Sequence, residues 1–292
     1  MTTSDALEFY AEHSPLTDPG PFAPLLDDLP RDLAGLHQIV QNVYIHVWKI
    51  RKYHPDWLKG RTHEYESRSV AHSLALVMKH SDRPLNEARP EAKKLIVDCR
   101  HHAVLLCALL RQQGVAARVR CGFATYLEKT HYQDHWVCEY WDGERWRMED
   151  PDLVKHDVTA EEFITGGRAW QMIRSKQISD MQFGFGPGAL GEWAMRYDLP
   201  RDLAALNKYE LLSGDSWGLM EKKEPLVTSK DRALLDEAAR WSTADNTDFA
   251  AMRHFYEGTE GLRVLDEVNL YNYIENKTKR GAWDDRAKGV SG

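Results

Sequence analysis

The chain contains few cysteines and no pattern that would cross-link them. Its 292 residues include four, Cys99, Cys107, Cys121 and Cys138, and no CxxC pair. Three of the four lie inside strongly apolar stretches, so we expect reduced thiols of an intracellular protein rather than a disulfide framework.

Long apolar runs are also missing. No stretch approaches eighteen uninterrupted apolar residues, and the first residues, MTTSDALEFYAEHS, carry Asp5 and Glu8 without a basic segment before an apolar run. These features speak against a membrane span and a secretory leader. We therefore expect a cytoplasmic protein without a membrane partner.

An excess of positive charge is missing as well. The chain has 38 lysines and arginines against 45 acidic residues, a formal net charge of −7, and its basic residues are spread without a long run. This excludes the common pattern of nucleic-acid binders, and we expect no nucleic-acid partner. The 42% of hydrophobic residues are enough to fill a sizeable core.

The positions of prolines and glycines between the apolar patterns divide the chain into four predicted segments. Residues 1–30 are rich in proline, which predicts an irregular N-terminal arm. Residues 31–215 are expected to form the core, residues 216–276 a helical C-terminal extension packed on it, and residues 277–292 a flexible tail.

Helical periodicity recurs on both sides of the centre. Apolar residues from Leu33 to Ile50 follow helical spacing, and a second helix is predicted over 64–80. Beyond Pro151 the pattern predicts helices near 160–173, 200–212, 230–242 and 247–257.

Residues 95–150 differ in character. Asp98 is a plausible N-cap for a helix that starts at Cys99, is apolar on every face from Ala103 to Leu110 and ends at Gly114. Strand-like segments follow over 117–126, 135–141 and 144–150. The fold class is therefore predicted as α+β, with a buried cysteine helix packed on an antiparallel sheet and additional helices N- and C-terminal to it.

Cys99 stands where a thiol can be activated. The first turn of a helix offers unpaired backbone N–H groups and the positive end of the helix dipole, which favour a thiolate and could later bind an oxyanion. Taken alone, however, a lone buried cysteine is more often a small core residue than a nucleophile.

A hairpin supplies the partners that a nucleophile needs. Asp142-Gly143 lies between two alternating runs and predicts a two-residue turn, which would place His135 directly opposite Asp150 on one face of the sheet. A structural salt bridge is the alternative for this pair. A thiol, a histidine and an acid in three successive elements favour a catalytic triad of Cys99, His135 and Asp150.

The stretches DCRHHAVLLCALLRQQGVAARVRCGF and DHWVCEYWDGERWRMEDPD resemble the core of the transglutaminase-like superfamily. The resemblance implies a papain-like core and places the family's Cys-His-Asp triad on the same three residues. More widely, TDPGPFAPLLDDLPRD and RDLAALNKYELLSGDSWGLM resemble bacterial transglutaminase-like proteins of poorly defined activity. Val97 stands where that family often has glycine, and His101 and His102 where an acidic or aromatic residue is common.

The predicted function is cysteine-dependent acyl transfer or hydrolysis on an amide, ester or thioester, through a covalent acyl-enzyme and without a cofactor. The expected partners are a small-molecule or peptide acyl substrate and an amine acceptor or carrier-bound thioester. Acyl transfer from a carrier thioester to an amine, as in arylamine acetyltransferases, is the first alternative. A catalytically silent binding module and a metal-binding structural protein are the others.

Further residues are weaker candidates. Substrate binding is assigned to five residues, partly on the resemblance: Trp136, Asn207, Lys208, Glu210 and Trp217. Arg118 and Arg120 alternate with core positions of their strand, so a solvated face is expected, with a carboxylate clamp as the alternative. The pairs His101-His102 and His131/His135 could suggest a metal. His131 and His135, however, lie in the approach to a strand, where residues four apart do not share a helical face, and no Cys pair completes a site, so no metal site is predicted.

Overall fold

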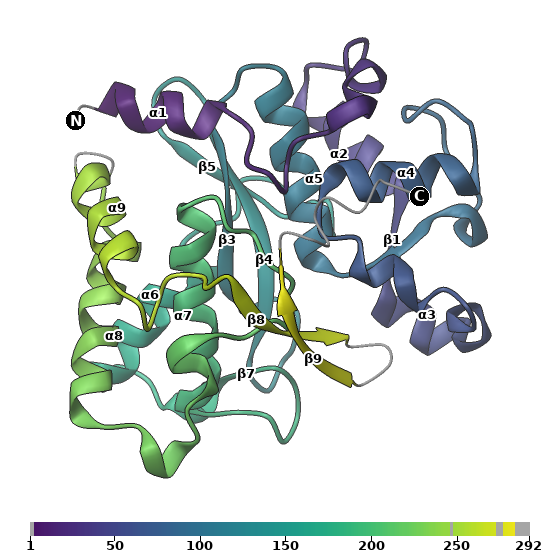
Figure 1. Ribbon diagram of the computed structural model, residues 1–292. Coiled ribbons are helices and arrows are strands. Elements are labelled where there is room, and N and C mark those ends of the chain that lie inside the picture. The colour runs from purple at the N-terminus through teal and green to yellow at the C-terminus, as the bar shows by residue number, and fades with distance from the viewer. Residues whose placement is uncertain (1–2, 246–247, 273–276, 284–292) are drawn as a thin grey trace.

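A computed structural model describes residues 3–245, 248–272 and 277–283. Its central antiparallel sheet has the order β5-β4-β3-β6, and β7 pairs with β4 in parallel (Figure 1). The strands are β3 (Ala117–Ala124), β4 (Tyr132–Trp141), β5 (Trp146–Glu149), β6 (Phe163–Thr165) and β7 (Phe183–Gly184). The fold is α+β, with the predicted order of a helix followed by a sheet.

The cysteine helix lies against this sheet. Helix α5 (Cys99–Gln112) is buried from Cys99 to Arg111 because apolar side chains surround it on all sides. Val119 of β3 and Trp136 of β4 belong to the same apolar cluster. The predicted packing of a buried cysteine helix on an antiparallel sheet is confirmed.

A second group of helices covers the other side of the sheet, at the left of Figure 1. It comprises α6 (Gly166–Arg174), α7 (Glu192–Leu206), α8 (Ser229–Ser242) and α9 (Phe249–Gly258). All four contribute to one apolar cluster together with Phe123 of β3.

The two arginines of β3, Arg118 and Arg120, are largely covered by other parts of the chain and do not point into solvent. Arg120 is 5% exposed, and its guanidinium contacts Asp202 of α7 at 2.8 Å and Glu139 of β4 at 3.1 Å. Arg118 pairs with Glu139 at 2.7 Å and lies 4.0 Å from the ring centre of Trp146. The expected solvated face is therefore wrong, because Glu139 of β4 and Asp202 of the distant helix α7 supply buried acidic partners.

The N-terminal residues are more regular than predicted. Helix α1 (Thr3–Ala11) precedes the first proline and buries Ala6 and Tyr10 on one face, and a 3-10 helix, η1 (Gly20–Leu26), follows. The irregular arm expected over residues 1–30 is therefore wrong for these two segments. The prolines interrupt the chain only after residue 14.

The helix expected from Leu33 to Ile50 is divided. Helix α2 (Leu33–Val43) ends before β1 (Tyr44–His46), which pairs in parallel with β2 (Leu95–Val97), and α3 (Val47–Tyr53) resumes the helix. This long-range pairing overrides the local helical spacing. The second helix, α4 (Val70–His80), begins later than predicted because Ser69 caps it.

The remaining elements lie mostly in the C-terminal half. Helix α7 continues through Pro200, so it begins eight residues before the predicted start at residue 200. Strands β8 (Glu267–Asn272) and β9 (Lys277–Ala282) pair, which corrects the flexible tail expected from residue 277, whereas residues 284–292 lie outside the described part. The short 3-10 helices are η2 (Pro55–Leu58), η3 (Thr62–Glu66), η4 (Glu91–Lys93), η5 (Asp180–Gln182), η6 (Gly218–Glu221) and η7 (Glu224–Leu226).

Among described residues, no helix combines the length and apolar character needed to cross a membrane.

Gly122 allows β3 to approach β6 closely. A Cβ atom at this position would lie 2.3 Å from the Ile164 carbonyl oxygen and 2.7 Å from the Thr165 Cα, both backbone atoms. We expect Gly122→Ala to lower the free energy of unfolding by about 1–3 kcal/mol, because the two strands must separate. Urea unfolding measures this, with Gly258→Ala as the control, since its Cβ would meet nothing within 4 Å.

Candidate active site

Cys99 occupies the first position of α5. The Asp98 carboxylate caps the helix by accepting a hydrogen bond from the backbone N–H of His101, as the sequence predicted for a helix that starts here. Cys99 is 8% exposed and lines a cavity. Cys99 therefore lies in the first turn of α5, where backbone N–H groups have no partner within the helix.

The β4–β5 hairpin has a different register from the predicted one. Trp141 lies opposite Trp146 and Cys138 opposite Glu149, so the turn contains four residues, 142–145, instead of two. The Asp142 carboxylate holds this longer turn by accepting the backbone N–H groups of Glu144 and Arg145, each at 2.9 Å. The prediction that His135 and Asp150 lie directly opposite each other in the hairpin is therefore wrong.

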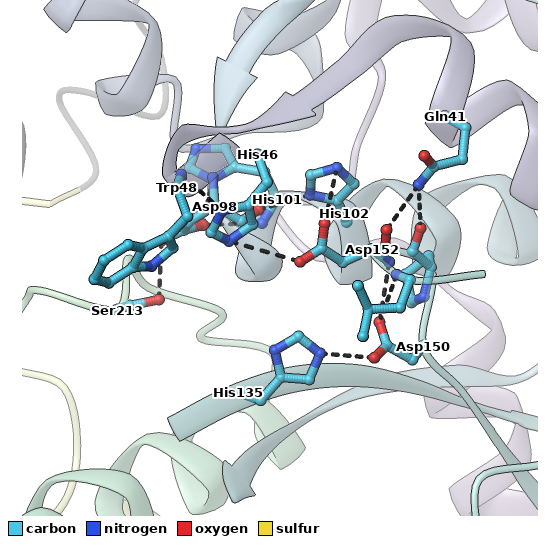
Figure 2. A network of polar contacts seen from close by, with 12 residues as sticks. Gln41, His46, Trp48, Asp98, His101, His102, His135, Asp150, Asp152 and Ser213 are labelled. Atoms are coloured by element: carbon cyan, nitrogen blue, oxygen red, sulfur yellow. Dashed lines mark hydrogen bonds and ion pairs between the residues drawn. The ribbon is translucent and has the colours of Figure 1, made fainter. Parts of the chain in front are cut away.

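His135 and Asp150 nevertheless meet. The register differs from the predicted one by two residues, and side chains of a strand alternate with a period of two, so the pair keeps its common face and is related diagonally. Nε2 of His135 lies 2.9 Å from Oδ2 of Asp150 (Figure 2). The predicted contact is present, although the turn that produces it was not the one expected.

Asp150 is held from several directions. It is fully buried, and its Oδ2 atom also accepts the Tyr126 hydroxyl at 2.8 Å. Its Oδ1 atom accepts the backbone N–H groups of Asp152 at 3.0 Å and Leu153 at 3.2 Å. The carboxylate orientation is therefore fixed, and Nδ1 is the ring nitrogen of His135 that does not face it.

The two charges stabilise each other. Burial disfavours the imidazolium, but the charge of Asp150 and its hydrogen bond outweigh burial and raise the pKa of His135 to about 8. Burial likewise opposes the ionised carboxylate, but His135 and the Tyr126 hydroxyl lower the pKa of Asp150 to about 2. At neutral pH this pair is a buried ion pair.

Cys99 and His135 line the same cavity, which has a volume of about 930 Å³. This volume lies at the upper end of the range typical of small-molecule sites. Aromatic side chains form part of its wall, and acidic and basic groups are both present: Tyr44, Trp48, Tyr65, Phe185, Trp193, Tyr197, Asp98, Glu128, Asp134, Asp152, Lys49, Lys94 and Arg201.

The thiol of Cys99 is not ionised by its surroundings alone. Burial and the nearby charges of Asp98, Asp134 and Asp152 raise its pKa well above the usual value, whereas a hydrogen bond with the backbone N–H of Trp136 lowers it only in part. The expectation of a thiolate stabilised by the helix start is therefore not met in the free protein. The thiol must lose its proton to a base.

Two sets of polar contacts at the cavity were not expected from the sequence. His46 of β1 and His102 of α5 face the Asp152 carboxylate from two sides, with the nearest nitrogen and oxygen atoms 3.6 Å apart in both cases (Figure 2). The Asp98 carboxylate also accepts hydrogen bonds from Tyr65 at 2.9 Å and Ser213 at 3.0 Å. The pairing of β1 with β2 brings His46 to the cavity, and no local pattern signals this.

None of the five predicted substrate-binding residues lines the cavity. Trp136 and Trp217 are core residues, and the Trp217 indole donates to the Leu262 carbonyl oxygen. Asn207 ends α7, and Glu210 accepts from Ser14 at 2.9 Å. Lys208 lies over the ring of Phe9. Lys208 and Glu210 thus contact the N-terminal segment, whereas Asn207 bonds within its own helix, to the Leu203 carbonyl oxygen. The polar groups of these three residues make contacts within the fold.

The histidine pairs that could have suggested a metal are engaged elsewhere. His101 contacts Asp98 at 2.6 Å, and His131 bonds to Gln133 at 2.8 Å. Two other groups of potential ligands come together among the described residues, each from separate elements. One contains His37, Glu149 and His156, and the other Cys121, Asp134 and Asp198.

Comparison with known proteins gives one family match and one similar solved structure. A family model described as the core of the transglutaminase-like superfamily matches residues 62–151. No curated protein matches the chain. The chain is also similar to a crystal structure from Cytophaga hutchinsonii described as "a putative cysteine protease", with 18% sequence identity and a TM-score of 0.34. That similarity covers 53% of this chain and 44% of the other, so it spans less than half of that protein. The segment that the family model matches, residues 62–151, includes Cys99, His135 and Asp150.

Proposed function

We propose that this protein is a cysteine-dependent acyltransferase or hydrolase in which Cys99, His135 and Asp150 act as a triad. One observation carries the proposal. Cys99 begins a capped helix and lines the same cavity as His135. Nε2 of His135 lies 2.9 Å from the carboxylate of the buried Asp150, which leaves Nδ1 to accept a proton. The match to the transglutaminase-like superfamily supports cysteine-based catalysis in general.

The first half of the reaction forms an acyl-enzyme. Neutral His135 accepts the thiol proton at Nδ1 as the Cys99 sulfur attacks the carbonyl carbon of the substrate. The negative charge that forms on the carbonyl oxygen is stabilised by the first-turn amides of α5, including the backbone N–H of Cys99. The bond to the leaving group then breaks, and the leaving group takes the proton from His135.

The second half regenerates the enzyme. Water or an amine attacks the thioester carbonyl, and His135 accepts its proton and returns a proton to the Cys99 sulfur as the carbon–sulfur bond breaks. Asp150 remains ionised and stabilises the charged form of His135. The substrate is a small-molecule or peptide acyl compound, because the cavity of about 930 Å³ accommodates a group of that size.

Trapping of the acyl-enzyme tests the proposal. The protein is incubated with an activated ester and analysed by intact mass and peptide mapping. We expect a single acyl group on Cys99 and none in Cys99→Ala. Acylation of other residues alone, or no acylation by ester, thioester or amide donors, would overturn the proposal.

The pH dependence of acylation follows from the raised pKa of His135. Only the neutral imidazole accepts the thiol proton, and with a pKa of about 8 the neutral fraction at pH 6 is roughly 1%. We expect kcat/KM to rise about tenfold per pH unit from pH 6 and to level off above pH 8. A profile that is flat from pH 6 to pH 9 would contradict this role of His135.

The same shift affects stability with the opposite sign. A raised pKa stabilises the fold fully below the ordinary histidine value, and this contribution is lost as the pH rises through about 8. The size of the shift corresponds to about 2 kcal/mol. Activity and stability should therefore change in opposite directions between pH 6.5 and pH 8.

A further inference from the structure

A second group of potential ligands lies outside the cavity, directly beside the loop that carries Asp150. It consists of His37 from α2, Glu149 from the end of β5 and His156 from the loop that follows. One ligand atom from each lies within 4.8 Å of the other two. Glu149 Oε2 is 3.1 Å from His37 Nε2 and 2.7 Å from His156 Nδ1.

The contacts within this group leave polar atoms unsatisfied. His37 is fully buried, and neither of its ring nitrogens has a hydrogen-bond partner in the described part of the chain, although Nε2 lies close to Glu149. Glu149 is also buried, and both of its ion pairs are with imidazoles. Its Oε2 atom is hydrogen-bonded to His156 Nδ1, and its Oε1 atom accepts the backbone N–H of Asp157 at 3.1 Å, so the unsatisfied atoms are the ring nitrogens of His37. A buried imidazole nitrogen that faces a carboxylate oxygen without a hydrogen bond is satisfied by a cation between them.

We propose that His37, Glu149 and His156 bind a zinc ion. Two imidazoles and one carboxylate are ligands that zinc accepts, and three protein ligands leave the fourth tetrahedral position for water. Zinc bonds of about 2.0–2.2 Å separate neighbouring ligands by roughly 3.3 Å. The observed separations of 3.1 Å and 2.7 Å need only a slight opening. The exposed side of His156 leaves the fourth position open to solvent.

The proposed zinc ion would hold the loop that carries Asp150. Glu149 immediately precedes Asp150, and His156 follows Lys155, whose backbone pairs with that of Asp150. The ion would therefore join both ends of the loop to α2. This inference stands independently of the proposed catalytic activity.

Isothermal titration of the metal-free full-length protein with zinc chloride tests the inference. The titration uses Cys99→Ala protein, so that zinc bound by the nucleophile does not contribute. We expect one equivalent of zinc, a rise in melting temperature with zinc, and binding weakened by about 100-fold or more in His37→Gln and in His156→Gln. His254→Gln, which changes an exposed histidine of α9, is the matched control and should bind as before.

The variants decide the outcome. His156 is half-exposed, so its replacement is compatible with folding even if His37→Gln is not. No saturable binding up to about millimolar zinc, or binding that His156→Gln leaves unchanged, would overturn the inference.

Discussion

Cys99→Ala is expected to lower kcat/KM by about 10⁴-fold or more for every acyl substrate while the fold is retained. In the proposed mechanism the sulfur atom forms the covalent bond, and alanine offers no nucleophile in its place. Cys99 is small and borders the cavity, so the replacement removes little packing and the melting temperature should change by only a few degrees. Steady-state kinetics and thermal unfolding measure the two effects.

Cys107→Ala is the matched control. Cys107 is fully buried in the same helix and does not line the cavity, so the variant should keep its activity per folded molecule. Equal activity of Cys99→Ala and Cys107→Ala would contradict a nucleophilic role for Cys99.

Asp150→Asn is expected to lower kcat by about 10³- to 10⁴-fold. Two backbone N–H groups hold the Oδ1 position, so the amide oxygen of asparagine stays there and its NH₂ group replaces Oδ2. This NH₂ group then donates to Nε2 of His135, which forces the ring proton onto Nδ1. Nδ1 can no longer accept the proton of the thiol.

The same variant should lower the pKa of His135. Without the negative charge, burial is no longer outweighed, and the pKa should fall from about 8 to below 6.5. NMR titration of His135 measures this shift, which loss of packing alone would not produce. Asp142→Asn, at the exposed turn of the same hairpin, is the control and should leave both the rate and the pKa unchanged. An unshifted His135 in Asp150→Asn would exclude the ion pair.

The Cys99 helix was predictable because its signals are local. Asp98 as a cap, the apolar run on all faces and Gly114 after the last turn lie within twenty residues, and the structure forms the helix accordingly. The strands after it were also located, although β4 begins three residues earlier than predicted. Short-range sequence patterns were therefore enough to predict the central helix and the strands that follow it.

The His135–Asp150 contact was predicted through a wrong register. Asp142 favours a longer turn by accepting two backbone N–H groups with its side chain, which the Asp-Gly signal alone does not reveal. The contact survived because a difference of two residues preserves the face of a strand. A difference of one residue would have separated the two side chains.

The walls of the cavity were not predictable, because they come from distant segments. His46 reaches Asp152 only because β1 pairs with β2, a contact that interrupts an otherwise helical pattern.

Arg120 resembled a solvated residue because its partner Asp202 lies on a helix 82 positions away. The predicted substrate residues Asn207 and Glu210 are polar because they close hydrogen bonds inside the core.

The rate of Cys99 alkylation by iodoacetamide as a function of pH tests the triad most directly. Peptide mapping reports Cys99 separately from the three other thiols. The triad predicts that Cys99 reacts first, that its rate rises with a midpoint near pH 8, where His135 becomes neutral, and that His135→Ala removes this rise. A rate no higher than that of the other cysteines, or the same pH profile in His135→Ala, would contradict the role of Cys99 as the nucleophile.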